Sequence, residues 1–420
     1  MSDWCEKALA DVCPTIRAGG TPASDRPDFY GGDIPFVTIE DITRAGRLIE
    51  STARSLTMAG LNSSAAWVVP PGHILFSMYA TLGKVVVNAV PVATNQAILS
   101  LKSDSSQLDL GLLFYALQFM EPQIRRLSAQ TTQANLSAQV VRRIFVRYPR
   151  ELPQQRRIAE ILGTVDEAIE QTEALIAKQQ QVKAGLMHDL FTRGLTPDGQ
   201  LRPTRTEAPD LYHETPLGWL PKEWPVESLG VLAEIVSGVT LSAKTEAGFG
   251  IQVPYLRVAN VQDGYLDLSE IKTVRVSSVQ LEKLRLRAGD VLMNEGGDFD
   301  KLGRGTVWNE EISPCIHQNH VFRVRPRTDR LRSRYLAFWS QSTQGKKFFV
   351  LNSKQSTNLA SINSMQLHRF PVVLPKLDEQ REIETRILAQ TDITAAETAH
   401  LGKLCQLRQG LMQALLTPPR

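Results

Sequence analysis

Residues 153–194 have the sequence PQQRRIAEILGTVDEAIEQTEALIAKQQQVKAGLMHDLFTRG. A related stretch recurs at residues 378–420 as DEQREIETRILAQTDITAAETAHLGKLCQLRQGLMQALLTPPR. Gln155-Arg156 matches Gln380-Arg381, and Gly185-Leu186-Met187 matches Gly410-Leu411-Met412. Both matches have the same offset of 225 residues (380 − 155 and 410 − 185), so no insertion lies between them. The chain therefore contains an internal duplication.

Apolar residues in both stretches recur at alternating spacings of three and four, which is typical of a coiled-coil seam. The first stretch has polar Thr172 and Gln179 near this seam, and the second has a register break near Gln390. The apolar seam residues of the first are Ile158, Leu162, Val165, Ile169, Ile176 and Leu186. Those of the second are Ile383, Ile387, Ile393, Leu401, Leu404, Leu407, Leu411 and Leu415.

Each stretch predicts one helix of about 40 residues, which would be about 60 Å long at about 1.5 Å per residue. A helix this long and amphipathic needs a partner. We expect the two copies to pair as an antiparallel coiled coil. The alternative is that each helix packs only into its own domain.

The region before each long helix is repeated more loosely. The matching segments include residues 34–37 and 253–256, which read as short strands, and residues 133–137 and 356–360 near the end of each region. Turn-punctuated short strands with a few helices predict a mixed domain in each copy. The expected fold class is α+β, with two pseudo-repeated mixed α/β domains separated by the two long helices. The expected boundaries are 1–150 and 222–376 for the domains, 151–195 and 377–420 for the helices, and 196–221 for a linker rich in Pro, Gly and Thr.

The composition is that of a globular protein, with 42% hydrophobic and 22% charged residues. The net charge of +3 permits nucleic-acid binding without demonstrating it. The four cysteines are scattered, which favours reduced thiols and argues against a structural zinc site. No apolar run is long enough to span a bilayer, and residues 1–13 lack a signal pattern. We expect a cytoplasmic protein with no membrane partner.

Catalytic motifs of the phosphate-loop, zinc-protease and serine-hydrolase kinds are absent from the sequence. One stretch offers an alternative, because Glu295, Asp298, Asp300 and Lys301 resemble an acidic metal-holding nuclease cluster. The equivalent stretch of the first copy, residues 78–84, contains no carboxylate. A duplicated catalytic site should keep its ligands, so we expect no catalytic and no metal-binding residues.

Arginines and polar loops point instead to nucleic acid. Arg323 and Arg325 alternate along a predicted strand, and further arginines lie at 125–126, 142–143, 147 and 150. Such stripes can neutralise phosphates, although a charge run is often only a solvated face. Loops rich in amides and hydroxyls occupy the same place in each copy, where they could bond base edges or phosphates. They comprise Gln130, Thr131, Thr132 and Asn135 in the first copy and Lys354, Gln355, Ser356, Thr357 and Asn358 in the second.

These features resemble a specificity subunit of type I restriction-modification enzymes over nearly the whole chain. The resemblance rests on the order of the duplicated elements, the Gly19-Gly20-Thr21-Pro22 turn, Ile34-Pro35-Phe36, Gly218-Trp219-Leu220-Pro221 opening the second half, and the two Gln-Arg pairs. It implies two target recognition domains, each reading half of a split, asymmetric site in double-stranded DNA. It also implies that the helices set the unread spacer and dock two methyltransferase subunits. S-adenosylmethionine, ATP and Mg would then belong to these and to the motor-nuclease subunits, and this chain would bind no cofactor.

From this resemblance we predict further DNA contacts besides those of the two polar loops. They come from a hairpin in each domain that faces a DNA groove, and from residues of the tight turns. The hairpin residues are Tyr79, Thr81 and Lys84 in the first domain and Asn294, Lys301 and Arg304 in the second. The turn residues are Gly20, Thr21 and Thr240. Three rival hypotheses stay open: a self-contained nuclease or methyltransferase, a scaffold that does not touch DNA, and a DNA-recognition or scaffold subunit of a related phage-defence complex.

Overall fold

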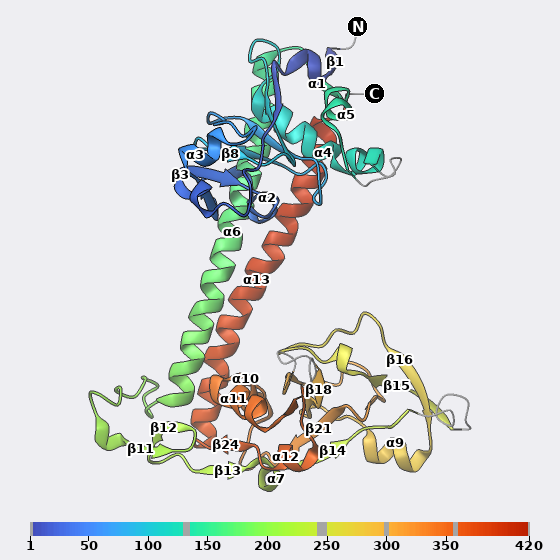
Figure 1. Ribbon diagram of the computed structural model, residues 1–420. Coiled ribbons are helices and arrows are strands. Elements are labelled where there is room, and N and C mark those ends of the chain that lie inside the picture. The colour runs from blue at the N-terminus through green and yellow to red at the C-terminus, as the bar shows by residue number, and fades with distance from the viewer. Residues whose placement is uncertain (1–2, 129–134, 242–249, 298–301, 356–359, 419–420) are drawn as a thin grey trace. The chain divides into compact units, whose positions relative to one another are not determined.

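The computed structural model describes residues 3–128, 135–241, 250–297, 302–355 and 360–418. The chain forms two compact units, one comprising Met1–Ile176 with Glu397–Arg420 and the other Ala177–Ala396. Each unit contains one mixed domain together with a part of both long helices (Figure 1).

The domain of the first unit is built on a five-stranded sheet. Its order is β2-β9-β6-β7-β4, with bounds Thr15–Ala18, Ile98–Lys102, Ile74–Ser77, Val85–Asn88 and Leu48–Ile49. A three-stranded sheet, β5-β3-β8, consists of Arg54–Leu56, Tyr30–Val37 and Ala93–Thr94. β1 (Trp4–Ala8) pairs with β10 (Phe145–Pro149). The helices are α1 (Leu9–Val12), α2 (Ile39–Arg44), α3 (Met58–Asn62), α4 (Leu110–Ser128), α5 (Ala138–Arg142) and the 3-10 helix η1 (Pro27–Phe29).

The domain of the second unit repeats this plan. Its main sheet has the order β14-β21-β17-β19, with bounds Ala233–Ser237, Val321–Pro326, Val291–Asn294 and Gly305–Val307. A sheet β16-β15-β20 consists of Lys272–Val276, Ile251–Leu256 and Ile316–His317, and β13 (Val226–Ser228) pairs with β24 (Pro371–Val373). The helices are α7 (Leu229–Leu232), α9 (Ser278–Leu284), α10 (Ser333–Gln341), α11 (Thr343–Asn352), α12 (Ser364–His368) and the 3-10 helix η3 (Val258–Asn260).

Strand pairing confirms the duplication. β3 pairs antiparallel with β5 and parallel with β8, and β15 pairs antiparallel with β16 and parallel with β20. The second copy adds a small sheet of β18 (Gly296–Gly297), β23 (Ala360–Ser361) and β22 (Lys354–Gln355). The segment expected as a linker contains the 3-10 helix η2 (Pro209–Leu211) and a hairpin of β11 (Tyr212–Thr215) and β12 (Gly218–Pro221).

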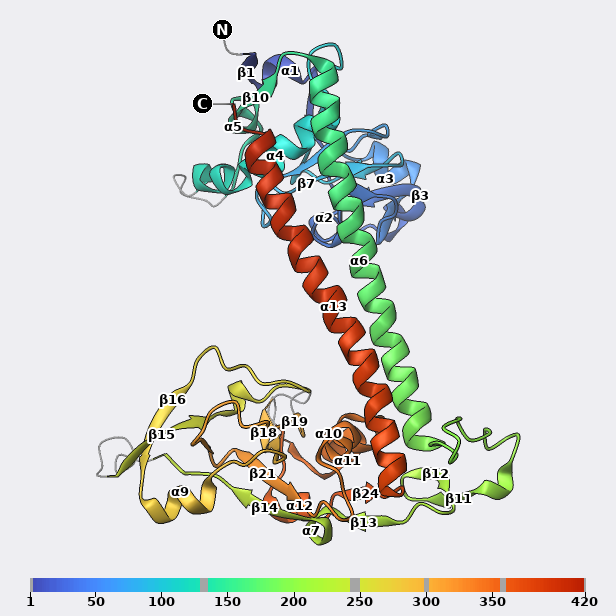
Figure 2. The same cartoon turned by 180° about the vertical axis from the view of Figure 1, so that it is seen from behind.

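The two long helices form an antiparallel coiled coil. α6 is 41 residues long (Leu152–Thr192) and α13 is 39 residues long (Leu377–Leu415). In the first unit, Arg408 Nε of α13 donates to Asp166 Oδ1 of α6 at 2.5 Å. In the second unit, Gln390 Nε2 of α13 donates to Gln179 Oε1 of α6 at 2.6 Å. Each unit thus pairs the early part of one helix with the late part of the other, and both figures show them side by side (Figures 1 and 2).

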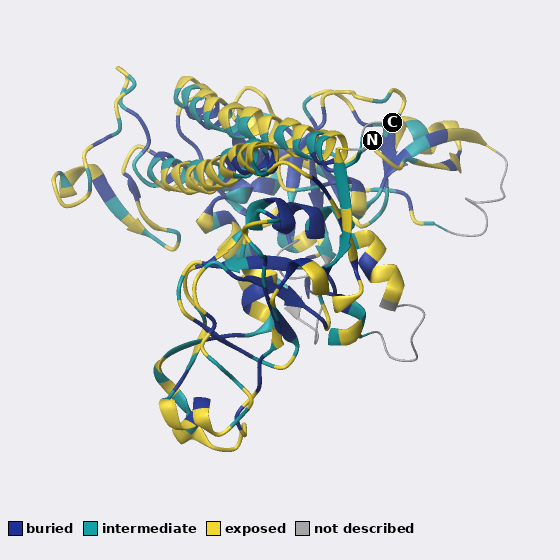
Figure 3. Ribbon diagram, turned by 90° about the horizontal axis from the view of Figure 1, so that it is seen from above, coloured by how far each residue is buried: buried dark blue, intermediate teal, exposed yellow. Residues whose placement is uncertain are grey.

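The seam of α13 is continuous, so the expected register break is wrong. Buried and half-buried residues keep the three-four spacing throughout: Ile383, Ile387, Gln390, Thr394, Glu397, Leu401, Leu404, Arg408, Leu411 and Leu415. Polar side chains fill the middle of this seam, whereas Ile393 and Leu407 are 47% and 51% exposed. The α6 seam comprises the expected Ile158, Leu162, Val165, Ile169, Ile176 and Leu186, with Thr172, Gln179 and Lys183 between them. Exposed residues line the outer faces of both helices (Figure 3).

Each domain core includes the ends of both helices. In the first unit, Ile158 and Leu162 of α6 lie in one buried cluster with Met412 of α13. In the second, Ile383 and Ile387 of α13 lie in one cluster with Phe191 of α6. Burial of these apolar side chains contributes roughly 1.5–3 kcal/mol each. The helices are therefore parts of the two domain cores as well as of the coiled coil.

Candidate nucleic-acid interface

Two equivalent tight turns pack against the neighbouring strand ends. A Cβ atom on Gly19 would lie 1.9 Å from the Thr94 carbonyl oxygen, and a Cβ on Gly238 would lie 1.9 Å from that of His317. Both positions therefore require glycine. The N–H of Gly20 donates to the Thr94 carbonyl at 2.9 Å. The predicted phosphate contact from the Gly20 N–H is wrong, because this N–H already donates to the Thr94 carbonyl.

The residue after each turn is exposed. Thr21 and Thr240 occupy equivalent places, and both lie at the surface. The Thr21 hydroxyl donates to the side-chain oxygen of Gln96, which is also exposed. These two threonines remain predicted contacts for DNA.

The predicted reading hairpin of the first domain is the loop between β6 and β7. Tyr79 is 40% exposed, and the next residue, Ala80, has φ +54°, which turns the chain sharply. Thr81 Oγ1 donates to Ser77 Oγ at 3.2 Å. Lys84 Nζ donates to the Thr43 carbonyl at 2.8 Å, and burial lowers the pKa of Lys84. Tyr79 is therefore the predicted hairpin side chain most accessible to a ligand.

Asn294 does not face a groove, which corrects the prediction for this residue. Its side chain is 1% exposed, and Nδ2 donates to the Val261 carbonyl at 2.9 Å. A polar side chain after a strand looks like a contact residue in the sequence, but here it satisfies a buried backbone carbonyl. Arg304 is half-buried and donates to Gln262 Oε1 at 3.2 Å. Lys301 lies outside the described residues, as do Asp298 and Asp300 of the alternative nuclease cluster.

The two polar loops are only partly described. Asn135 is half-buried, and Lys354 and Gln355 form β22, which pairs with β23. Gln130, Thr131, Thr132, Ser356, Thr357 and Asn358 lie outside the described residues. Their roles in DNA binding stay predictions.

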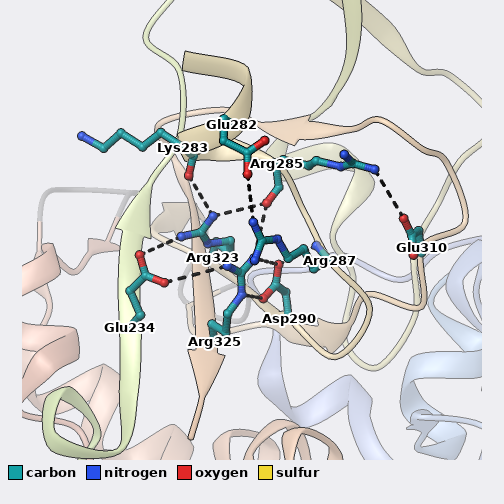
Figure 4. Close-up of polar contacts among 9 residues, drawn as sticks. All are labelled: Glu234, Glu282, Lys283, Arg285, Arg287, Asp290, Glu310, Arg323 and Arg325. Atoms are coloured by element: carbon teal, nitrogen blue, oxygen red, sulfur yellow. Dashed lines mark hydrogen bonds and ion pairs between the residues drawn. The ribbon is translucent and has the colours of Figure 1, made fainter. Parts of the chain in front are cut away.

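Both arginines of the β21 stripe bind carboxylates within the protein, so the predicted phosphate contacts from them are wrong (Figure 4). Arg323 is 2% exposed; its guanidinium donates to Glu234 Oε1 at 3.0 Å and to the Lys283 carbonyl at 2.9 Å. Arg325 binds the carboxylate of Asp290 through two hydrogen bonds of 2.6 and 2.8 Å, which raise the pKa of Arg325. Such bidentate pairs are among the stronger polar contacts in proteins. These arginines join β21 to β14 and to the turn before β17.

Several arginines of the first domain also have partners. Arg142 donates to the Ile16 carbonyl at 2.6 Å, and Arg147 pairs with Glu6 at 2.9 Å. Arg126 and Arg143 are exposed and make no ion pair within the part of the chain that the structure describes. Exposed arginines without a carboxylate nearby are the better candidates for phosphate contacts.

The described residues lack two other kinds of feature, a metal site and a membrane-spanning helix. Among them, no group of three or more His, Cys, Asp or Glu side chains is placed to hold a metal ion. Within the same residues, no helix combines the length and the apolar character needed to cross a membrane.

Two mixed domains with matching strand pairing, together with the two long paired helices, define a duplicated two-domain protein. Residues 1–180 and 221–404 match the model of the type I restriction modification DNA specificity domain. The chain therefore belongs to this family. The resemblance inferred from the duplicated motifs is confirmed.

Curated relatives of the chain are named as specificity subunits of type I restriction enzymes. The MjaVIII specificity subunit of Methanocaldococcus jannaschii is 21% identical over 77% of this chain and 73% of its own length. The MjaIX subunit of the same organism is 23% identical over 62% of this chain and 59% of its own length. The HindI specificity subunit of Haemophilus influenzae is 36% identical over 25% of this chain and 22% of its own length. The chain thus spans less than two thirds of the length of some of these relatives.

Two solved structures share the fold. The S subunit of a type I restriction-modification system from M. genitalium has a TM-score of 0.59 and 14% identity, with 100% of this chain and 97% of that chain covered. A chain from a structural study of complex assembly and conformational transition in a type I system has a TM-score of 0.58 and 18% identity, with 98% and 97% covered. At these identities the likeness concerns the fold.

Proposed function

We propose that this chain is the non-catalytic DNA-recognition subunit of a type I restriction-modification complex. In this proposal, residues 1–150 and 222–376 are target recognition domains, and each reads one part of a bipartite, asymmetric site. The observation that carries the proposal is the duplication, because two domains that share the pairing of four strands present exposed Thr21 and Thr240 at equivalent places. Two similar reading domains in one chain suit a site in two unlike halves.

The long helices would serve as spacer and as docking surface for two methyltransferase subunits. The support is a pair of equivalent surface patches, each consisting of an exposed apolar residue and a glycine three positions later. Val182 and Leu407 are 47% and 51% exposed, and a Cβ added at Gly185 or Gly410 would have nothing within 4 Å. A helix-interior glycine costs roughly 1 kcal/mol relative to alanine. Nothing within the described chain uses these glycines, whereas close approach of a partner would.

Equivalent patches on the two helices favour two copies of one partner rather than two different partners. Substituting Gly185 with Leu should remove one methyltransferase subunit from the complex, and Gly185→Leu with Gly410→Leu should remove both. Gly402→Leu is the matched control, because Gly402 is also an open helical glycine but lies outside the patches. Mass measurement of the purified complexes tests this. Unchanged stoichiometry in the double variant would exclude these patches.

DNA recognition is tested with the polar loop of the second domain. Lys354→Ala with Asn358→Ala should weaken salt-matched binding of the cognate site, because a lost base contact costs about 1–3 kcal/mol. A change of less than about threefold would rule the loop out. Adenine-methylation profiling after expression with a cognate methyltransferase identifies the site. A footprint of that site should then show two protected patches with a gap between them, which a scaffold would not produce.

The purified chain alone should neither cleave nor methylate DNA in the presence of magnesium and S-adenosylmethionine. In the proposed division of labour, S-adenosylmethionine binds to the methyltransferase subunits, and ATP and Mg bind to the motor-nuclease subunits. Activity of the single chain would favour the self-contained enzyme. A related phage-defence complex remains the second candidate, because the same fold would serve there.

A further inference from the structure

A polar network joins the long helices to the domain of the first unit. Asp166 of α6 is at its centre: it accepts a hydrogen bond from Arg408 Nε at 2.5 Å and one from the Tyr115 hydroxyl at 2.9 Å. Arg408 also donates to Gln118 Oε1 at 2.7 Å. The Asp166 side chain is only 12% exposed. A cation on α13 thus has its carboxylate partner on α6.

The equivalent positions in the second unit have a different chemistry. The helix offset of 225 residues places Lys183 at the Arg408 position and Thr391 at the Asp166 position. Gln155 and Gln380 align α4 with α10 through their bonds to the N–H groups of Asp109 and Arg332. This alignment makes Phe338 and Gln341 the counterparts of Tyr115 and Gln118. The cation is therefore retained, and the carboxylate is replaced by a threonine.

Lys183, Thr391, Phe338 and Gln341 all line one cavity of the second unit. Its volume is about 440 Å³, and Asp263, Tyr265, Asn309, Glu311, Arg334 and Leu388 also line it. Arg334 is exposed and donates to Asn309 Oδ1 at 3.3 Å, whereas Lys183 is half-buried. The Thr391 hydroxyl donates to the carbonyl of Ile387 at 2.8 Å, within its own helix. The cavity lies where the first unit has the Asp166 carboxylate and the Tyr115 hydroxyl.

Lys183 has no hydrogen bond or ion pair within the described part of the chain, although it is half-buried. Both carboxylates of the cavity wall have other partners. Asp263 pairs with Lys346 at 3.1 Å, and Glu311 accepts hydrogen bonds from the N–H and the side-chain amide of Asn309, each at 3.0 Å. Burial lowers the pKa of Lys183, and the nearby charge of Asp263 offsets this only in part. Partial burial of a cation that no carboxylate hydrogen-bonds is unfavourable, and an anion bound directly to it would reduce that penalty.

We propose that this cavity binds a small carboxylate anion, with the Lys183 ammonium as its cationic partner. The carboxylate would stand in for the one that Asp166 supplies in the first unit. Phe338 and Leu388 offer apolar contacts to a short hydrocarbon body. The inference rests on the comparison of the two copies and is independent of the proposed role in DNA recognition.

Succinate is the probe. Calorimetric titration of the full chain at pH 7 and constant ionic strength should show saturable binding. Lys183→Met should weaken it by at least about tenfold, because a hydrogen bond between charged groups is lost. Lys178→Met is the matched control, since Lys178 is an exposed lysine of α6 outside the cavity, and it should bind as the unmodified chain does. Equal affinity of the unmodified chain and Lys183→Met, or no saturable binding, would overturn the proposal.

A second variant tests the cavity without removing the lysine. Thr391→Asp places a carboxylate where the first unit has one, so it should abolish succinate binding and raise the thermal unfolding temperature of the second unit. Thr391→Asn, which has nearly the same shape without the charge, should still bind succinate. Succinate binding by Thr391→Asp with unchanged affinity would contradict the assignment to this cavity.

Discussion

Gln155 and Gln380 make the same three hydrogen bonds in the two copies of the domain. Gln155 Oε1 accepts from the N–H of Asp109, and its Nε2 donates to two carbonyls, those of Gln107 and Pro149. Gln380 repeats this pattern with the N–H of Arg332 and the carbonyls of Arg330 and Pro375. Both side chains are fully buried. The repeated Gln-Arg pair therefore ties the start of each long helix to the start of the helix of the preceding domain.

We predict that Gln155→Leu destabilises the first unit by about 3 kcal/mol, because three backbone groups lose a buried partner at roughly 1 kcal/mol or more each. Urea unfolding combined with hydrogen exchange measures the loss and assigns it to the unit. Gln154→Leu is the control, since Gln154 is exposed on the same helix turn. Equal stability of the two variants would contradict the assigned role.

The two close-packed turns give a second prediction. Gly238→Ala should destabilise the second unit by about 2–3 kcal/mol, since its Cβ would collide with a backbone oxygen that cannot move independently. Gly185→Ala, in open space on α6, should instead stabilise the isolated chain by about 0.5–1 kcal/mol. Thermal unfolding of both variants is the measurement. A neutral Gly238→Ala would mean that the turn can shift away from β20.

A third prediction concerns pH. His317 is fully buried, Nδ1–H donates to the Val321 carbonyl at 2.6 Å, and Nε2 has no partner among the described residues. Burial lowers the pKa of His317 to about 4, so the unfolded chain binds the proton more tightly than the folded chain. The second unit should therefore lose stability as the pH falls from about 6.5 to about 4, by up to ~3 kcal/mol, and gain nothing above pH 6.5.

The control for this pH dependence is His317→Asn, whose amide can replace the Nδ1–H donor without titrating. Urea unfolding between pH 4 and pH 7 should show a shallower slope for this variant. An unchanged slope would assign the pH dependence to the carboxylates instead.

The ion pair between the long helices gives a fourth prediction. Arg408→Met should cost about 2–3 kcal/mol, because it leaves the Asp166 carboxylate without its cation in a site only 12% exposed. Arg157→Met should cost at most about 1 kcal/mol, since its pair with Glu160 is 69% and 66% exposed. Chemical denaturation measures both. Similar losses would show that the interhelix pair acts only as a surface contact.

Local sequence patterns were sufficient to predict the duplication, the α+β class and the extent of the two long helices. Apolar spacing reports directly on the face that a helix buries, so Ile158, Leu162, Ile383 and Ile387 were identified without coordinates. The polar part of the α13 seam was not identified from the sequence, because Gln390 and Arg408 belong to the seam only through their partners on α6. A search by apolar periodicity finds Ile393 and Leu407 instead.

Which polar residues are available to a ligand could be seen only in the folded chain. Arg323 and Asn294 look like surface contact residues in the sequence, yet both are buried against groups that are distant along the chain. Glu234 lies 89 residues from Arg323, and the carbonyl that Asn294 bonds lies 33 residues away. Whether a polar side chain meets solvent or satisfies a buried partner depends on such long-range pairing, which local sequence patterns do not encode. Lys183 and Arg408 differ for the same reason. Their positions on the long helices are equivalent, but Arg408 pairs with Asp166 on the other helix, whereas the residue equivalent to Asp166 in the second unit is Thr391, and Lys183 lines a cavity.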